Sequence, residues 1–293
     1  MPRLLAVTVV AALLAPGPPA RPRIRGISHM AVRVSDIAAA RAFYEDFLGL
    51  RGLVVNARQH VELVPGLAPE QDRLDHIALE TEDAGAMRRY LAARGVDVPA
   101  RVVQGADGGA RFTVRDPEGH AVEFVERAAT ARSQPEPTAP PGDPRISRRI
   151  LHVGIIVGDV PAAMKFYGDV LGFSETWRGS RTGTELSWIN MKVPDGSDYV
   201  EFMLYGQRPA MAARGTQHHL CLEVADIEAS RTLLEARPYR ATYPRLLEVR
   251  VGTNRKRQLN LYDPDGTRTE LMEPITVDGQ PTPSSTARPP LRP

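Results

Sequence analysis

The sequence predicts an α+β protein made of two similar halves. FYEDFLGL at 43–50 matches FYGDVLGF at 166–173, and DPEG at 116–119 matches DPDG at 263–266. A histidine precedes the first motif by 14 residues in both halves, as His29 and His152. Similarity at fixed offsets indicates an internal duplication. Residues 128–147, which carry five prolines, are expected to be a linker between the halves.

A shorter repeat lies within each half. Four histidines are each followed by an aspartate seven residues later, in the pairs His29/Asp36, His76/Asp83, His152/Asp159 and His219/Asp226. Each histidine opens an aliphatic run such as HMAVRV or HVGIIV, which is typical of a strand. Each aspartate suits the N-cap of the helical pattern that follows it. Gly49, Gly95 and Gly172 suit the residue just after a helix, where a left-handed backbone favours glycine.

Each of these four units closes on a strand that contains a glutamate. The four strands read VELV (61–64), VEFV (122–125), VEFM (200–203) and TELM (269–272). The chain therefore consists of four strand–helix–strands units, each with a histidine on its first strand and a glutamate on its last.

The recurrent histidines and glutamates predict a metal site. A carboxylate within an apolar strand, such as Glu201 in YVEFM, is costly unless it is paired or bound to a cation. Imidazole and carboxylate together bind divalent cations such as zinc, nickel, iron(II) or manganese. One such histidine or glutamate alone is more often a surface or hydrogen-bonded residue, but surface residues need not recur at the same place in every unit.

The two halves differ in the spacing between these residues. The histidine-to-glutamate separation is 47, 49 and 51 residues in the last three units but 33 in the first. We expect about one strand and its turn to be missing there, which would leave the first cleft open. The working site is therefore expected in the second half, and the first site is expected to be vestigial, structural or regulatory.

These motifs resemble those of a known superfamily. SHMAVRVSDIAAARAFYEDFLGL and LHVGIIVGDVPAAMKFYGDVLGF resemble the opening, and DPEGHAVEFVE and DPDGTRTELME the closing strand, of vicinal oxygen chelate proteins. The resemblance implies two tandem domains, 24–127 and 148–275, each made of two βαβββ modules that form a U-shaped mixed sheet. It also implies one divalent ion, nickel, zinc, manganese or iron(II), in the concave face.

The resemblance also implies which residues act. The second domain would bind the metal through His152, Glu201, His219 and Glu270, and Glu270 would also move a proton as the catalytic residue. A second metal site would use His29, Glu62, His76 and Glu123. Whether the modules pair within a domain or across domains stays open at this point.

The expected activity is that of a lyase or isomerase which stabilises an enediolate-type anion on a small oxygenated substrate. The His-Glu-His-Glu set is similar to that of bacterial glyoxalase I. One alternative is a non-haem iron ring-cleaving dioxygenase. Extradiol members use two histidines and one glutamate, and they carry a tyrosine where this chain has Asn260. The other alternative is a non-enzymatic protein that binds a metal or an antibiotic.

The net charge and the N-terminal segment limit the partners and the location that we expect for the protein. The net charge of +2 gives no electrostatic case for nucleic acid. Residues 1–20 are expected to be a signal peptide of a secreted or periplasmic protein, with a cytoplasmic location as the alternative. The apolar run 4–15 is too short to span a membrane. A monomer or homodimer is expected.

Shorter features of the sequence also predict local structure. RKR at 255–257 is expected to be a solvated hairpin tip, with a carboxylate or phosphate clamp as the alternative. His60 shares the strand face of Glu62, and His218 is expected to point away from the site. The single cysteine, Cys221, is expected to be a buried thiol. The tail 276–293 is expected to be disordered.

Overall fold

A computed structural model describes residues 19–105, 108–132 and 142–291. The predicted signal peptide over 1–20 lies outside the described residues except for its last two positions. Residues 133–141 of the predicted linker are also outside them. In the described part of the chain, no helix has the length and apolar character that crossing a membrane requires.

The first half forms a six-stranded mixed sheet in the order β2-β1-β3-β6-β5-β4. Its first module contains β1 (Ile24–Val34), α1 (Ile37–Arg41), the π-helical turn η1 (Ala42–Phe47), the short 3-10 turn η2 (Arg51–Leu53) and β2 (His60–Pro65). Its second module contains β3 (Leu74–Thr81), α2 (Ala84–Ala93), β4 (Val103–Gln104), β5 (Ala110–Arg115) and β6 (Ala121–Glu126), and α3 (Ala129–Arg132) follows.

The second half forms an eight-stranded mixed sheet in the order β12-β13-β14-β11-β7-β10-β9-β8. Its first module contains β7 (Ile150–Val157), α4 (Val160–Ala163), η3 (Met164–Val170), β8 (Ser174–Gly179), β9 (Trp188–Lys192) and β10 (Tyr199–Leu204). After α5 (Met211–Arg214), its second module contains β11 (His219–Glu223), α6 (Ile227–Glu235), η4 (Pro238–Ala241), β12 (Val249–Val251), β13 (Lys256–Tyr262) and β14 (Arg268–Thr276).

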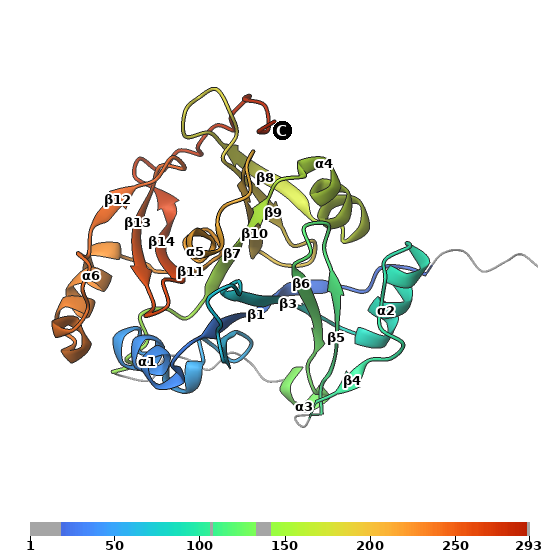
Figure 1. The fold of residues 1–293 in the computed structure, drawn as a ribbon, viewed down its shortest axis with the longest axis horizontal. Coiled ribbons are helices and arrows are strands. Elements are labelled where there is room, and N and C mark those ends of the chain that lie inside the picture. Colours follow the sequence, from blue (N-terminus) through green and yellow to red (C-terminus); the bar gives the residue numbers. More distant parts are fainter. Residues whose placement is uncertain (1–18, 106–107, 133–141, 292–293) are drawn as a thin grey trace, which may run out of the picture.

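The predicted α+β fold of two tandem, duplicated domains is confirmed. In each domain the first strands of the two modules pair antiparallel at the centre of the sheet, β1 with β3 and β7 with β11. Each of these strands also pairs in parallel with the glutamate-bearing last strand of its own module. Figure 1 shows the sheets curling, with the helices on their outer sides.

The aspartates that follow the strand histidines cap the helices. Asp36 accepts hydrogen bonds from the backbone N–H groups of Ala38 and Ala39, and Asp83, Asp159 and Asp226 each accept one from the residue three positions on. These contacts satisfy N–H groups that have no partner within the helix. Gly49, Gly95 and Gly172 have positive φ after their helices, as their positions indicated.

The first module lacks more of the sheet than the spacing suggested. Two strands, β8 and β9, separate the helix from β10 in the third module, whereas only η2 and a single bridge at Val54 occupy the same interval in the first. The expectation of about one missing strand is therefore wrong. The shorter connection turns directly from η2 into β2, so this side of the first sheet ends at β2.

The C-terminal tail also differs from the expectation of disorder. The Ser285 backbone N–H donates to the Arg178 carbonyl of β8, and the Leu186 N–H donates to the Arg288 carbonyl. Glu185 and Arg288 form a parallel bridge. The described tail residues therefore lie against the edge of the eight-stranded sheet, where the backbone groups of β8 have no other strand to pair with.

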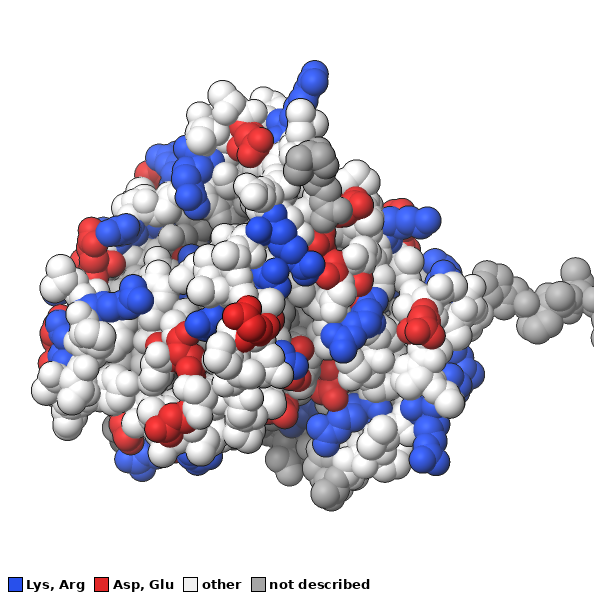
Figure 2. All heavy atoms as spheres, viewed as in Figure 1, with Lys and Arg blue, Asp and Glu red and all other residues white. Residues whose placement is uncertain are grey.

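The two domains contact each other through matching groups. The Tyr44 hydroxyl of the first domain donates to Asp263 of the second (3.3 Å), and the Tyr167 hydroxyl donates to Asp116 of the first (3.0 Å). These residues belong to the duplicated FY and DPxG motifs. Figure 1 shows α1 beside α6, and Figure 2 shows acidic and basic side chains interspersed over the same face.

Candidate metal centres

The strand register brings the histidines and glutamates together. In every parallel pair the glutamate lies two residues beyond the register partner of the histidine: His152 pairs with Tyr199, and Gly154 pairs with Glu201. In the central antiparallel pair, His219 lies opposite Gly154 and His152 lies opposite Cys221. Side chains two residues apart share a strand face. Both histidines and both glutamates therefore project from the same concave face.

In the second domain four ligand atoms converge. His152 Nε2 and His219 Nε2 are 2.9 Å apart. Glu201 Oε2 lies 3.8 Å from His152 Nε2 and 3.4 Å from His219 Nε2. Glu270 Oε2 lies 3.5 Å and 3.6 Å from the same two nitrogens. An ion about 2.1 Å from each ligand would separate neighbouring ligand atoms by about 3.0–3.4 Å. The four atoms are spaced as the ligands of one small divalent cation would be.

Electrostatics favours a positive charge at this point. Burial raises the pKa of Glu270, but hydrogen bonds with His152 and His219 outweigh burial and hold that pKa well below its usual value. Burial lowers the pKa of His219, yet the two carboxylates raise it overall. The two carboxylates therefore favour a positive charge between them, which a divalent ion would supply.

The surroundings also orient the His219 ring. His219 Nδ1 lies 2.7 Å from the Gln217 carbonyl oxygen and 2.7 Å from an Arg268 guanidinium nitrogen, and these contacts leave Nε2 facing the other ligand atoms. A side-chain Cβ at Gly154 would lie 2.0 Å from this ring. Gly154 therefore lets the ring lie flat against β7, which positions Nε2 over the centre.

The first domain contains a second cluster of the same kind. His29 Nε2 and His76 Nε2 are 2.9 Å apart. Glu62 Oε2 lies 3.2 Å from His29 Nε2 and 3.9 Å from His76 Nε2. Glu123 Oε2 lies 3.6 Å from both nitrogens, is buried, and has no hydrogen-bond partner within the described residues. An unpartnered buried carboxylate oxygen that points into a ligand cluster fits a missing cation.

The two clusters differ in exposure. Glu62 has 41% of its side chain exposed, whereas its counterpart Glu201 has 10%. His60 of the first domain stacks on His29 with ring centroids 4.4 Å apart. Burial, followed by the charge of His29, lowers the His60 pKa to about 4, so its imidazole is neutral near neutral pH. The first centre is therefore open to solvent on the side of β2.

The structure thus shows how the modules pair. His152 and Glu201 meet His219 and Glu270, and no ligand set crosses between the domains among the described residues. Cys221 is buried within reach of His152 and Glu270. His218 is buried and points away from the centre, towards the ring of His120.

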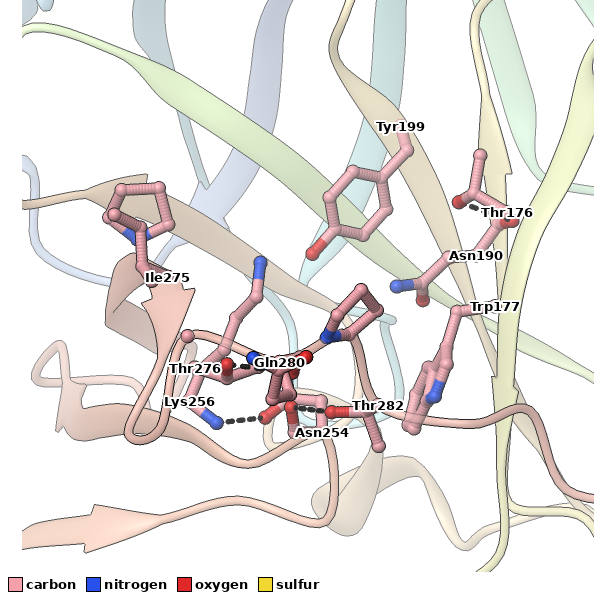
Figure 3. Close-up of a pocket in the computed structure, with 13 residues that line it drawn as sticks. Thr176, Trp177, Asn190, Tyr199, Asn254, Lys256, Ile275, Thr276, Gln280 and Thr282 are labelled. Atoms are coloured by element: carbon pink, nitrogen blue, oxygen red, sulfur yellow. Dashed lines mark hydrogen bonds between the residues drawn. The ribbon is translucent and has the colours of Figure 1, made fainter.

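A cavity adjoins the second centre. A small space of about 70 Å³ is lined by Glu201, Glu270, Arg268 and Trp177. Trp177 and Asn254 also line a larger cavity of about 390 Å³, which Tyr199 and Asn190 border as well (Figure 3). The Tyr199 ring stacks on His152 with centroids 4.5 Å apart, so the larger cavity lies beside a ligand.

Sequence reasoning did not identify most of these cavity residues. Asn190 lies on β9, which carries none of the repeated histidines or glutamates, so the duplication gives no signal for it. Tyr199 lies on β10 two residues before Glu201, and strand alternation gives a signal for it because both side chains project from one face. Trp177 borders both cavities, whereas the Tyr205 hydroxyl donates to Glu118 of the first domain at 2.6 Å.

Comparison with known families places the chain. A sequence model of the Glyoxalase/Bleomycin resistance protein/Dioxygenase superfamily matches residues 26–124 and 149–271. The chain belongs to this superfamily. Several solved structures share its fold. They include the 2,3-dioxygenase LapB from Pseudomonas sp. KL28, with a TM-score of 0.63 and 16% identity over 89% of this chain and 97% of that one.

Several of the curated relatives are named as dioxygenases, and others are uncharacterized proteins. Metapyrocatechase 2 of Cupriavidus necator is 28% identical over 236 residues, which are 72% of this chain and 69% of that protein. Biphenyl-2,3-diol 1,2-dioxygenase of Sphingomonas paucimobilis is 33% identical over 133 residues, or 38% of this chain. That match spans 44% of the relative's length.

Proposed function

We propose that this protein is a divalent-metal-dependent ring-cleaving dioxygenase that acts on an aromatic substrate with two adjacent hydroxyl groups. The observation that carries the proposal is the convergence of four ligand atoms: the two histidine Nε2 atoms lie 2.9 Å apart, and an oxygen of Glu201 and one of Glu270 each lie 3.4–3.8 Å from both nitrogens. The dioxygenase names of the relatives support this reaction over the lyase or isomerase expected from the ligand set.

The residues of the centre have separable roles in this proposal. A bound divalent ion would act as a Lewis acid towards two vicinal oxygens, and iron(II) would add reactivity towards O2. The two histidines and both glutamates would hold the ion. Glu201, the second carboxylate beside it, would accept a proton from a substrate hydroxyl. The burial of these side chains excludes water from the face where the substrate would bind.

One observation favours a second candidate. Asn260 is the register partner of Glu270 on the adjacent strand. By the resemblance described above, extradiol members carry a tyrosine at this position. With an amide in place of that phenol and two carboxylates at the ion, the centre also suits a lyase or isomerase that stabilises an enediolate. In that reaction Glu270 would move the proton between two carbon atoms.

Metal-dependent assays of the full chain separate these reactions. Metal-free protein is reconstituted with iron(II) under argon and then mixed with air-saturated 2,3-dihydroxybiphenyl or catechol, and oxygen uptake is followed. The proposal expects stoichiometric oxygen consumption that is lost in His219→Ala. Proton exchange or isomerisation with nickel or zinc, without oxygen uptake, would instead establish the second candidate. Tight binding of a diol with no turnover would identify a binding protein and overturn both.

We also propose that the first domain binds a divalent ion through His29, Glu62, His76 and Glu123. The support is the buried, unpartnered Glu123 oxygen together with the 2.9 Å separation of the two Nε2 atoms. This ion would be structural or regulatory, because the first module lacks the strands that carry Asn190 and Trp177 in the second domain and so forms no matching wall.

A further inference from the structure

The hairpin RKR at 255–257 does not lie wholly in solvent. Arg255 forms an ion pair with Asp278, and the Arg257 side chain is exposed. Lys256 is half-buried and lines the cavity of about 390 Å³ beside the second centre. Figure 3 shows its side chain extending into the cavity towards Ile275 and Tyr199. The alternation of side chains along β13 thus directs one of the three cations inward.

The inward-facing ammonium has no counter-charge. Within residues 19–105, 108–132 and 142–291, no hydrogen bond or ion pair is formed by Lys256 Nζ. The carboxylate of Glu223, which contributes to its electrostatic environment, is already paired with Arg149 at 2.9 Å. Burial lowers the pKa of Lys256, which reports the cost of holding the charge there. An anion in the cavity would offset that cost.

Two more polar groups in the same cavity lack partners. The Trp177 indole N–H and the Asn190 side-chain oxygen are buried without a hydrogen bond in the described residues. Buried polar groups are normally hydrogen-bonded. Tyr199, Ile275 and Pro281 add aromatic and apolar surface to the wall, whereas threonine, asparagine and glutamine side chains make up much of the rest. The cavity therefore combines aromatic and apolar surface with a cation, and Tyr199 on its wall stacks on the candidate ligand His152.

The tail forms one wall of this cavity. Gln280 and Thr282 line it, and the Thr276 hydroxyl donates to the Gln280 carbonyl at 2.8 Å. The Thr282 hydroxyl donates to the carbonyl of Asn254, which also borders the smaller space next to Glu270. These contacts make the tail one wall of the cavity, which brings the tail residues within reach of a molecule bound beside Lys256.

We propose that Lys256 selects substrates which carry a carboxylate on a side chain, placed across the aromatic ring from the two oxygens that reach the metal centre. This inference rests on the proposed function for the reacting end of the substrate. The charged end of the substrate is inferred from the residues of the cavity alone. One ammonium matches a monoanion, and Trp177 and Tyr199 fit the faces of a single aromatic ring.

Equilibrium binding to the full, metal-loaded chain tests the charged end without turnover. The probes are phenylacetate and its neutral isostere phenylacetamide, titrated by calorimetry. Neither has vicinal hydroxyl groups, so binding does not depend on ring cleavage. A charge-assisted hydrogen bond corresponds to roughly a tenfold to hundredfold preference for the anion. Lys256→Met, which keeps the apolar stem, should abolish the preference, and Lys256→Arg should retain most of it.

Arg257→Met is the matched control, because it removes the same charge from the neighbouring position with an exposed side chain. It should bind phenylacetate as the wild type does. Equal affinity of the wild type for both probes, or undiminished phenylacetate binding by Lys256→Met, would overturn the inference. The second result would indicate that the carboxylate binds the metal directly.

The inference and the proposed function fail separately. If phenylacetate binding depends on Lys256 but no diol consumes oxygen, the anion site stands and the reaction is wrong. If diols are cleaved, the ratio of kcat/KM for 3,4-dihydroxyphenylacetate to that for 4-methylcatechol should fall at least about tenfold in Lys256→Met. An unchanged ratio in an active enzyme would refute the inference alone.

Discussion

At the scale of single residues, Glu270 has the position of a metal ligand. Its Oε2 lies within 3.6 Å of both histidine nitrogens, and its side chain is almost fully buried. Loss of groups that merely support a ligand costs about 10–100-fold in metal affinity, so loss of a ligand should cost at least that. We expect Glu270→Ala to weaken zinc binding by about a hundredfold or more at one site, measured by competition with a chromogenic chelator.

The control for this variant is Glu228→Ala on α6, whose carboxylate is about half exposed and pairs with Arg231. It removes a charge from the same domain but should leave zinc affinity unchanged. Wild-type affinity at both sites in Glu270→Ala would show that Glu270 is not a ligand.

Glu201 gives a second prediction at this scale. Burial raises its pKa, but the histidines outweigh burial and lower it overall. Glu201→Gln keeps the shape and removes the charge, so the bound metal loses part of its attraction. We expect the difference between the melting temperatures with metal and with chelator to shrink relative to wild type. An undiminished difference would mean that Glu201 does not contact the ion.

At the scale of elements, the strands missing from the first module predict that the two centres differ in metal affinity. The first module has no counterpart of β8 and β9, and Glu62 at its open edge is 41% exposed. A ligand that is free to move and to be hydrated binds metal more weakly. We expect the site that remains in His219→Ala, in the first domain, to bind zinc more weakly than the site that remains in His76→Ala.

Both variants are measured in the full chain, so each domain keeps its contacts with the other. Equal affinities, or tighter binding in His219→Ala, would overturn the ranking and would make the first domain the better candidate for a working site.

The elements were predictable from the sequence where they repeat. His29, His76, His152 and His219 marked four strands, and the aspartates seven residues later marked four helix starts, because capping chemistry is local. The number of strands missing from the first module was underestimated, because chain length alone does not distinguish a strand from the 3-10 turn at 51–53.

The candidate site was predictable from the sequence only where its residues repeat. The ligand set follows from recurrence, but Lys256 and the tail follow from no repeat. RKR resembles a solvated tip, and only the twist and register of β13 against β14 show that its middle residue faces the cavity. The order of the tail depends on an unpaired edge at β8, which is a tertiary feature.

At the scale of the whole molecule, matched contacts join the domains. Asp263 accepts hydrogen bonds from the Thr267 backbone and the Tyr44 hydroxyl. Burial, together with the charge of Asp265, raises the pKa of Asp263 to about 6. The folded state therefore holds a proton that the unfolded chain releases near pH 4. Stability from this group is complete below about pH 4 and is lost as pH rises through about 6.

This linkage predicts a pH-dependent effect of Asp263→Asn, which cannot ionise. Relative to wild type, the variant should gain about 2 kcal/mol of stability between pH 4 and pH 7. Urea unfolding of both proteins with chelator present, at pH 4 and at pH 7, measures the change. A constant difference between the two proteins across this range would show that Asp263 is already ionised at pH 4.

The central claim is that His152, Glu201, His219 and Glu270 hold one divalent ion. Anomalous diffraction from crystals of the full chain, grown with zinc and measured on both sides of the zinc edge, tests it most directly. We expect an anomalous difference peak about 2.0–2.2 Å from Nε2 of both histidines and from an oxygen of each glutamate. A zinc-saturated crystal with no peak between these four side chains would contradict it.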